Sequence, residues 1–131
     1  MIDRRIFLAF AANALVFAGI AVTRAAEHTP FTQEGFVTAQ KAGRPILVHI
    51  TASWCPTCKA QRPILSKLSA EPRFKDLAVF DVDFDSQKDV VRAFNAPMQS
   101  TLITFKGSAE LGRSVGDTDA KSIEALLDRT V

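Results

Sequence analysis

Two cysteines separated by two residues are the part of this sequence best suited to chemistry. They are Cys55 and Cys58, with Pro56 and Thr57 between them, and the 131-residue chain has no other cysteine. A disulfide that stabilises a fold usually closes a long loop, because a long loop constrains the unfolded chain most. A bridge over two residues closes a very short loop, so the spacing indicates a dithiol that is reversibly oxidised.

Two other uses of such a cysteine pair are disfavoured by the neighbouring residues. Haem attachment needs a histidine directly after the second cysteine, and this chain has Lys59 there. A structural zinc site needs four ligands, and only His28 and His49 could add nitrogen ligands. We therefore expect no metal and no cofactor within one chain, while a copper or zinc site shared between two chains stays open.

The dithiol is expected where a buried strand leads into a helix. Residues 45–52 form a nearly continuous apolar run rich in β-branched side chains, which predicts a central strand. The pattern then predicts a turn at residues 53–54 and a helix over residues 55–69. Pro56 suits the first helical turn, where its missing N–H costs nothing, whereas Pro63 should kink the helix.

The remaining pattern predicts an α/β fold. The expected arrangement is a mixed four-stranded sheet flanked by helices on both faces. Residues 27–31 are expected to form a linker. Periodicity and capping residues predict further strands over residues 77–84, 101–105 and 111–115, and helices over residues 32–42, residues 86–94 and the segment after Asp117 or Thr118.

The first 25 residues have the pattern of an export signal. Arg4 and Arg5 precede a mainly apolar run over residues 6–22, and small residues near Ala25 suit a signal peptidase. The arginine pair before a Phe-Leu pair also resembles a twin-arginine signal. An uncleaved anchor is the alternative, although the run is shorter than the about 20 apolar residues of a membrane span. The predicted organisation is a signal segment at 1–25 and one domain at 26–131, in a periplasmic or otherwise exported protein.

Charge excludes one class of partner for this domain. Residues 26–131 contain equal numbers of basic and acidic side chains. A cationic face for a phosphate backbone is therefore not expected, and we predict no nucleic-acid partner.

The motif Trp54-Cys55-Pro56-Thr57-Cys58-Lys59, after a buried strand and at the start of a helix, resembles the active site of the thioredoxin family. Pro63, residues 101–107 and residues 116–117 match the family's kinked helix, its late strand and turn, and the start of its last helix. The resemblance covers residues 31–130 and implies a thioredoxin-like fold.

The resemblance also implies roles for individual residues. Cys55 would be the nucleophile and Cys58 the resolving thiol, and the two would form a disulfide. Substrate contacts would fall on the residues next to the dithiol and on the loop that faces it in the family: Trp54, Pro56, Thr57, Gln99, Ser100 and Thr101. The expected partners are proteins with disulfides or thiols and an unidentified redox donor or acceptor, which a membrane protein could supply. A monomer is expected.

Two departures from the family concern residues on neighbouring strands. Six positions before the first cysteine, where the family often has a buried acid, this chain has His49. His49 is either a hydrogen-bonded core residue or the base that accepts the Cys58 proton. Asp81 stands where the family has a lysine, and it could hold the His49 tautomer or belong to a solvated face with Asp83 and Asp85.

The third departure is Ser100, which replaces the family's cis-proline. A cis bond before a residue other than proline costs about 3–4 kcal/mol, so the Gln99–Ser100 bond is expected to be trans. The Ser100 hydroxyl could then lie beside Cys55 and change the choice of substrate.

These observations favour an enzyme: an exported thiol–disulfide oxidoreductase that exchanges its Cys55–Cys58 dithiol with protein substrates. The alternative is a thioredoxin-fold binding module that holds a metal ion or a partner without redox turnover.

Overall fold

The computed structural model of the chain describes residue 19 and residues 26–131. The expected signal segment therefore lies outside the described residues, apart from Gly19. No helix in the described part of the chain is long and apolar enough to cross a membrane.

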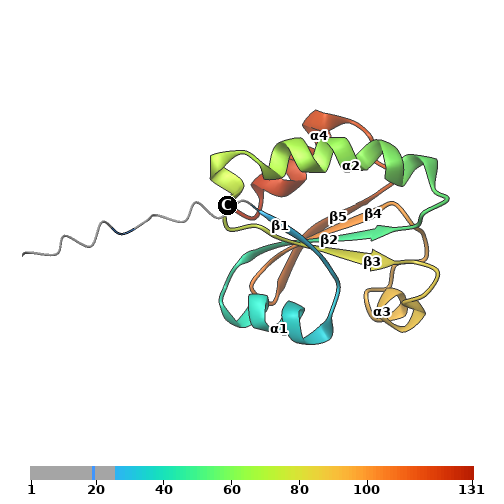
Figure 1. Cartoon of the computed structure of the whole chain (residues 1–131), viewed down its shortest axis with the longest axis horizontal. Coiled ribbons are helices and arrows are strands. Elements are labelled where there is room, and N and C mark those ends of the chain that lie inside the picture. The colour runs from blue at the N-terminus through green and yellow to red at the C-terminus, as the bar shows by residue number, and fades with distance from the viewer. Residues whose placement is uncertain (1–18, 20–25) are drawn as a thin grey trace, which may run out of the picture.

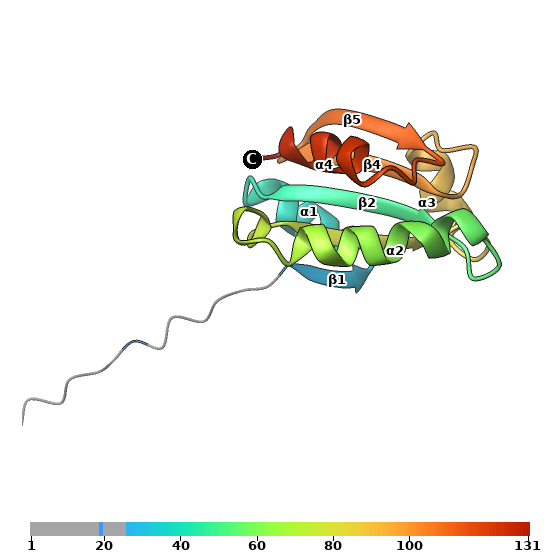
Figure 2. The ribbon, with the colours of Figure 1, turned by 90° about the horizontal axis from the view of Figure 1, so that it is seen from above.

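A five-stranded mixed sheet forms the centre of the molecule (Figures 1 and 2). Its strand order is β1-β3-β2-β4-β5, with parallel pairing among the first three strands and antiparallel pairing of β4 with β2 and β5. The strands are β1 (Glu27–Pro30), β2 (Pro45–Thr51), β3 (Ala78–Asp83), β4 (Thr101–Lys106) and β5 (Ala109–Val115).

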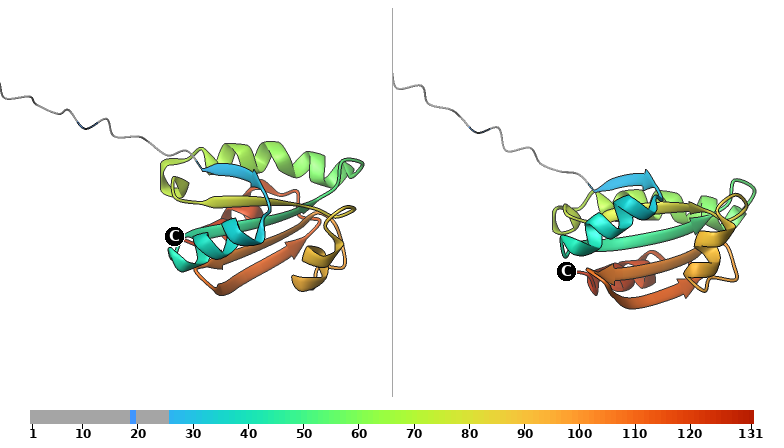
Figure 3. Two further views of the ribbon diagram at one scale, coloured as in Figure 1. Left: turned by 60° about the horizontal axis from the view of Figure 1, so that its bottom comes forward. Right: turned by 90° about the horizontal axis from the view of Figure 1, so that it is seen from below.

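Helices cover both faces of the sheet. Helices α2 and α4 pack on one face, and α1 and α3 lie on the other (Figures 1 and 3). The helices are α1 (Gln33–Lys41), α2 (Pro56–Ser69), α3 (Lys88–Ala93) and α4 (Ala120–Asp128), with a 3-10 turn at Pro72–Phe74.

The thioredoxin-like α/β fold is confirmed, but the predicted number of strands is wrong. Residues 27–30, expected as a linker, form β1, which pairs in parallel with β3 from Ala78 to Asp81. Edge strands are often short and carry charged residues or proline, and the four residues Glu27–Pro30 contain both, so they lack the alternation of a half-buried strand. The short polar segment gave no such signal.

Two helix starts also differ from the prediction. The residue before α3 is Gln87 and not Ser86, because Asp83 Oδ1 accepts the N–H of Ser86 and keeps it in the preceding turn. Helix α4 is capped by Asp119 and not by Asp117 or Thr118, because the Asp119 carboxylate accepts the N–H groups of Lys121 and Ser122.

Strand β2 divides its side chains between two cores. Ile46, Val48 and Ile50 pack in the cluster on the α1 and α3 side, while Leu47 packs against α2 and α4. His49 faces α2 as well, because its ring bonds to Gln61 of that helix. The alternation of a pleated strand thus brings one titratable side chain under the helix that carries the cysteines.

Candidate active site

The two cysteines lie at the start of α2 and are joined by a disulfide, with their Cα atoms 5.3 Å apart. Cys55 is the N-cap residue of the helix, and its Sγ accepts a hydrogen bond of 3.1 Å from the N–H of Cys58. Pro56 occupies the first helical position, where no N–H is needed. The unpaired N–H groups and the dipole of a helix start favour negative charge, so this position suits a cysteine sulfur that must become an anion.

The surface beside the dithiol is partly apolar. Trp54, which directly precedes Cys55, is 57% exposed, and its indole N–H donates to Asp85 Oδ2 at 2.7 Å. Pro56 is exposed and Thr57 is half-buried, whereas both cysteines are buried. The hydrogen bond to Asp85 holds the Trp54 ring on the outside of the molecule, where a partner could contact it.

A tight turn after β3 positions Asp85. The Asp83 carboxylate accepts the N–H groups of Ser86 at 2.8 Å and Asp85 at 2.9 Å. The N–H of Ser86 is the main cause of an Asp83 pKa below its ordinary value, because hydrogen bonds from N–H groups favour the charged carboxylate. The three aspartates therefore do not share one role: Asp81 contacts His49, Asp83 organises the turn, and Asp85 holds Trp54.

His49 lies in a polar site under α2. Only 2% of its side chain is exposed, and its Nε2 lies 3.0 Å from Gln61 Oε1. Its Nδ1 lies 3.4 Å from Asp81 Oδ1, because His49 and Asp81 are register partners on neighbouring parallel strands. A pocket of about 230 Å³ adjoins this pair, lined by His28, His49, Arg62, Leu65, Ser66 and Asp81.

The loop before β4 is held through the main chain of Ser100. Every described peptide bond is trans, so the Gln99–Ser100 bond is trans as expected, and Ser100 has a φ of 56° in the left-handed region. Its carbonyl accepts hydrogen bonds from Gln61 Nε2 at 3.1 Å and from the N–H of Gly116 at 3.0 Å. Its hydroxyl donates to the carbonyl of Gln99 at 2.6 Å, so the loop itself holds this group rather than a cysteine sulfur.

Thr101 and Met98, on either side of Ser100 in the chain, differ in burial. Thr101 is buried at the start of β4, and its hydroxyl donates to the carbonyl of Met98 at 2.6 Å. Met98 itself is 49% exposed. Hydrogen bonds within the loop therefore fix the main chain and leave the Met98 side chain at the surface.

Gln61 is the residue of this region that the sequence reasoning missed. It is fully buried on α2, three residues after Cys58, and links His49 to the carbonyls of Ser100 and Asp117. The available signal was its spacing, because Gln61 precedes Leu65 by four residues and so shares the buried face of the helix. A polar side chain on a buried helical face needs hydrogen-bond partners within the protein.

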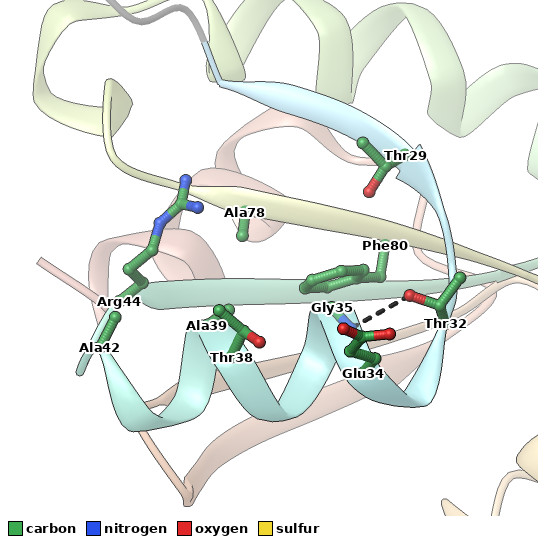
Figure 4. Close-up of a pocket in the computed structure, with 10 residues that line it drawn as sticks. All are labelled: Thr29, Thr32, Glu34, Gly35, Thr38, Ala39, Ala42, Arg44, Ala78 and Phe80. Atoms are coloured by element: carbon green, nitrogen blue, oxygen red, sulfur yellow. Dashed lines mark hydrogen bonds between the residues drawn. The ribbon is translucent and has the colours of Figure 1, made fainter.

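Another cavity lies away from the cysteines and from His49, and it is lined by different residues. A volume of about 550 Å³ lies between α1 and strands β1 and β3, lined by residues such as Thr29, Glu34 and Phe80 (Figure 4). It is on the face of the sheet opposite α2. Among the described residues, no group of three or more His, Cys, Asp or Glu side chains could hold a metal ion.

A five-stranded α/β sandwich with a disulfide at the start of its longest helix defines a class of proteins, the thiol–disulfide oxidoreductases of the thioredoxin fold. Comparison with known proteins gives the same result. The Thioredoxin family model matches residues 27–129, and the chain is 36% identical over 97 residues to a thioredoxin of Mycobacterium tuberculosis. That match covers 73% of this chain and 80% of the relative.

Two further relatives differ in how much of them this chain spans. The crystal structure of Trxlp from Edwardsiella tarda superposes with a TM-score of 0.75 at 40% identity, covering 77% of this chain and 98% of that one. A bifunctional thioredoxin reductase/thioredoxin of Mycobacterium leprae is 34% identical over 92 residues, covering 70% of this chain but 19% of the relative. The chain belongs to the thioredoxin family and is a thiol–disulfide oxidoreductase.

Proposed function

We propose that the protein is an exported oxidoreductase for protein disulfides, in which Cys55 attacks the substrate and Cys58 resolves the intermediate. The observation that carries this assignment is the place of Cys55 as N-cap of α2, with its Sγ accepting the Cys58 N–H. A hydrogen bond from an N–H to an anion is stronger than one to a neutral atom. The same contact would therefore stabilise a Cys55 thiolate in the reduced protein.

Reduction of a substrate disulfide takes two exchanges. The Cys55 thiolate attacks one substrate sulfur, the substrate S–S bond breaks, and the other substrate sulfur leaves and takes up a proton. Cys58 then loses its proton and attacks Cys55 Sγ, which releases the second substrate sulfur as a thiol. Two electrons pass to the substrate and the Cys55–Cys58 disulfide forms, so a dithiol donor must reduce it again. The reverse sequence oxidises a substrate dithiol.

Substrate would bind over Trp54, Pro56, Thr57 and the loop formed by residues 99–101. Exposure of the Trp54 ring supports a contact with an apolar segment of a protein substrate. The Ser100 carbonyl is already bonded to Gln61 and Gly116, and the Gln99 carbonyl accepts the Ser100 hydroxyl. Main-chain pairing with a substrate would compete with this last bond, which supports a substrate preference different from that of family members with proline.

His49 is proposed to take up the proton that Cys58 loses. Its burial on the α2 side of β2, in contact with Gln61 one turn beyond Cys58, supports this role. A positioned base raises the fraction of Cys58 that is present as the attacking anion.

Export rests on the pattern of residues 1–25. Fractionation of cells that express the full chain is expected to find a shortened protein in the periplasm, with a new N-terminus near Ala26. Full-length protein in the cytosol alone would contradict export without affecting the assignment of the cysteines.

Trapping of mixed disulfides tests the cysteine roles. Cys58→Ser should accumulate covalent adducts with exported proteins through Cys55, because the resolving attack is removed. Cys55→Ser is the matched control and should trap none. An absence of adducts with Cys58→Ser, or equal trapping by both variants, would contradict the proposal.

A further inference from the structure

Hydrogen-bond chemistry fixes the orientation of the Gln61 amide. Its side-chain nitrogen lies 3.1 Å from the carbonyl oxygen of Ser100 and 2.9 Å from that of Asp117. Carbonyl oxygens only accept hydrogen bonds, and an amide nitrogen only donates them. The NH₂ group must therefore face these two loops, and Oε1 must face His49.

This orientation determines which ring nitrogen of His49 carries a hydrogen. Oε1 of Gln61 can only accept, so the His49 nitrogen 3.0 Å away, Nε2, has to donate. In the neutral ring the other nitrogen, Nδ1, is then unprotonated. That atom lies 3.4 Å from the Asp81 carboxylate, which is also an acceptor. Two acceptors face each other until a proton is placed between them.

We propose that Gln61 is a positioning residue that keeps Nε2 of His49 protonated, so that His49 exchanges its proton at Nδ1 and Asp81 connects this proton to solvent. The inference rests on the proposed role of His49 in thiol exchange. The proton that Cys58 loses, once accepted at Nδ1, converts the neutral ring to an imidazolium that is paired with the Asp81 carboxylate. Loss of the same proton through Asp81 restores the neutral ring, so protons balance over a cycle.

The pocket beside His49 supplies the outlet for this proton. The Asp81 side chain is 39% exposed whereas His49 is 2% exposed, so the carboxylate is the member of the pair that meets water. The other titratable side chains that line the pocket are Arg62 from α2 and His28 from β1. Arg62 donates to Thr51 Oγ1, and His28 Nε2 lies 3.1 Å from Ser69 Oγ. Among the described residues that line this pocket, Asp81 is thus the one carboxylate.

The opposite arrangement would leave buried groups without partners. A rotated Gln61 amide would place Oε1 against the carbonyls of Ser100 and Asp117 and lose two hydrogen bonds. An unprotonated Nε2 with the present amide would oppose Oε1 inside the protein. Since Gln61 has no exposed surface, water cannot compensate for either loss.

Nitrogen NMR of the full chain labelled with ¹⁵N-histidine tests the tautomer directly. The chain has only two histidines, and His28→Gln assigns their signals. We expect the oxidised protein to show Nε2 of His49 protonated throughout the range from about pH 5 to 9. A neutral His49 ring protonated at Nδ1 would overturn the proposal. Because this measurement needs no turnover, its result is independent of mixed-disulfide trapping. The tautomer can be wrong while trapping succeeds, and trapping can fail while the tautomer is as expected.

Two variants separate the roles of Gln61 and Asp81. Gln61→Met keeps a buried side chain of similar length without the carbonyl, and it should shift neutral His49 toward the tautomer that donates from Nδ1 to Asp81. Unchanged His49 signals would contradict the role of Gln61. Asp81→Asn should retain the Nε2 proton of His49 but slow thiol exchange by about tenfold, because the carboxylate that connects Nδ1 to solvent is lost.

If Gln61→Met does not fold, Asp81→Asn still tests the proposal. Residue 81 is partly exposed, so this substitution should leave the fold intact. An unchanged rate of thiol exchange in Asp81→Asn would contradict the part assigned to Asp81. The rate of thiol exchange as a function of pH gives a second measurement. Its dependence on pH should change in both variants, whereas a merely structural role would lower the rate equally at every pH.

Discussion

The two faces of the sheet are built from different chemistry, although they share the same strands. On the α1 and α3 side, ring centroids of neighbouring phenylalanines lie 5.4 to 6.0 Å apart, mostly edge to face. The rings belong to Phe31, Phe36, Phe80, Phe94 and Phe105. On the α2 and α4 side, a mainly aliphatic cluster that includes Leu47 and Leu65 shares the face with a buried polar pair, His49 and Gln61.

This difference separates stability from chemistry within a small domain. The aromatic cluster needs only apolar burial and ring packing, which are favourable wherever the shapes fit. Groups that bond in one orientation only, such as the Gln61 amide, depend on the exact position of their partners. Substitutions on the aromatic face should therefore affect stability alone, whereas substitutions in the polar pair should also affect thiol exchange.

The largest expected effect is on the dithiol itself. Cys55→Ser should lower the rate of insulin reduction by at least about a thousandfold, because the attacking sulfur is absent. Ser53→Ala, an exposed change two residues earlier, serves as control and should keep the rate. A Cys55→Ser protein that retained a tenth of the activity would assign the attack to Cys58.

A change on the aromatic face should affect stability alone. Phe36→Ala removes a buried ring that contacts four others, and it should lower the free energy of unfolding by about 3–5 kcal/mol. The equilibrium of the Cys55–Cys58 pair with glutathione should stay within about twofold, as the change lies across the sheet. Denaturant unfolding and thiol quantification measure the two quantities. A large shift in the redox equilibrium would contradict the separation of the faces.

A change in the polar pair should affect both measurements. His49→Leu should slow thiol exchange at neutral pH by about ten- to a hundredfold, because Cys58 loses its base. It should also lower stability by about 1–3 kcal/mol, since Gln61 Oε1 is left buried without a donor. His28→Gln is the control, and stopped-flow kinetics over a range of pH is the measurement. An unchanged pH–rate profile would exclude His49 as the base.

The smallest expected effect concerns the turn that places Asp85. Asp83→Ala removes the acceptor of two N–H groups and should cost about 1 kcal/mol of stability. Because the Asp83 pKa is lowered in the folded protein, its contribution is present above the ordinary value of about 3.9 and is lost as pH falls through the lowered value. The stability difference from the parent protein should therefore shrink from pH 5 to pH 3.

Chemical unfolding at several pH values, with Asp76→Ala as an exposed control, checks this behaviour. A stability difference that grew as pH fell would contradict the assigned contacts of Asp83. A Trp54 fluorescence spectrum that differs between this variant and the parent protein would show that the turn positions the indole through Asp85.

Much of the fold followed from local sequence signals. The apolar run over residues 45–52 and the proline after Cys55 predicted the β2–α2 unit, because burial and helix capping depend on nearby residues. Strand β1 was missed because its pairing with β3 comes from tertiary contact and leaves no pattern in residues 27–30. The start of α3 was misplaced because Asp83, outside the helix, holds Ser86.

The candidate site was predictable in part for the same reason. The cysteine spacing and the apolar run over residues 45–52 predicted that Cys55 and Cys58 lie at a helix start and His49 on a strand, where the structure has them. Gln61 was missed because its three partners come from β2, the loop before β4 and the loop before α4. Contacts between segments this far apart in the chain require the assembled sheet.

Alkylation of the reduced protein tests the assignment of the two thiols most directly. Iodoacetamide at neutral pH, with mass spectrometry to locate the adduct, should modify Cys55 at least about tenfold faster than Cys58, because the sulfur at the helix start is available as an anion. Equal and slow modification of both thiols would contradict the account.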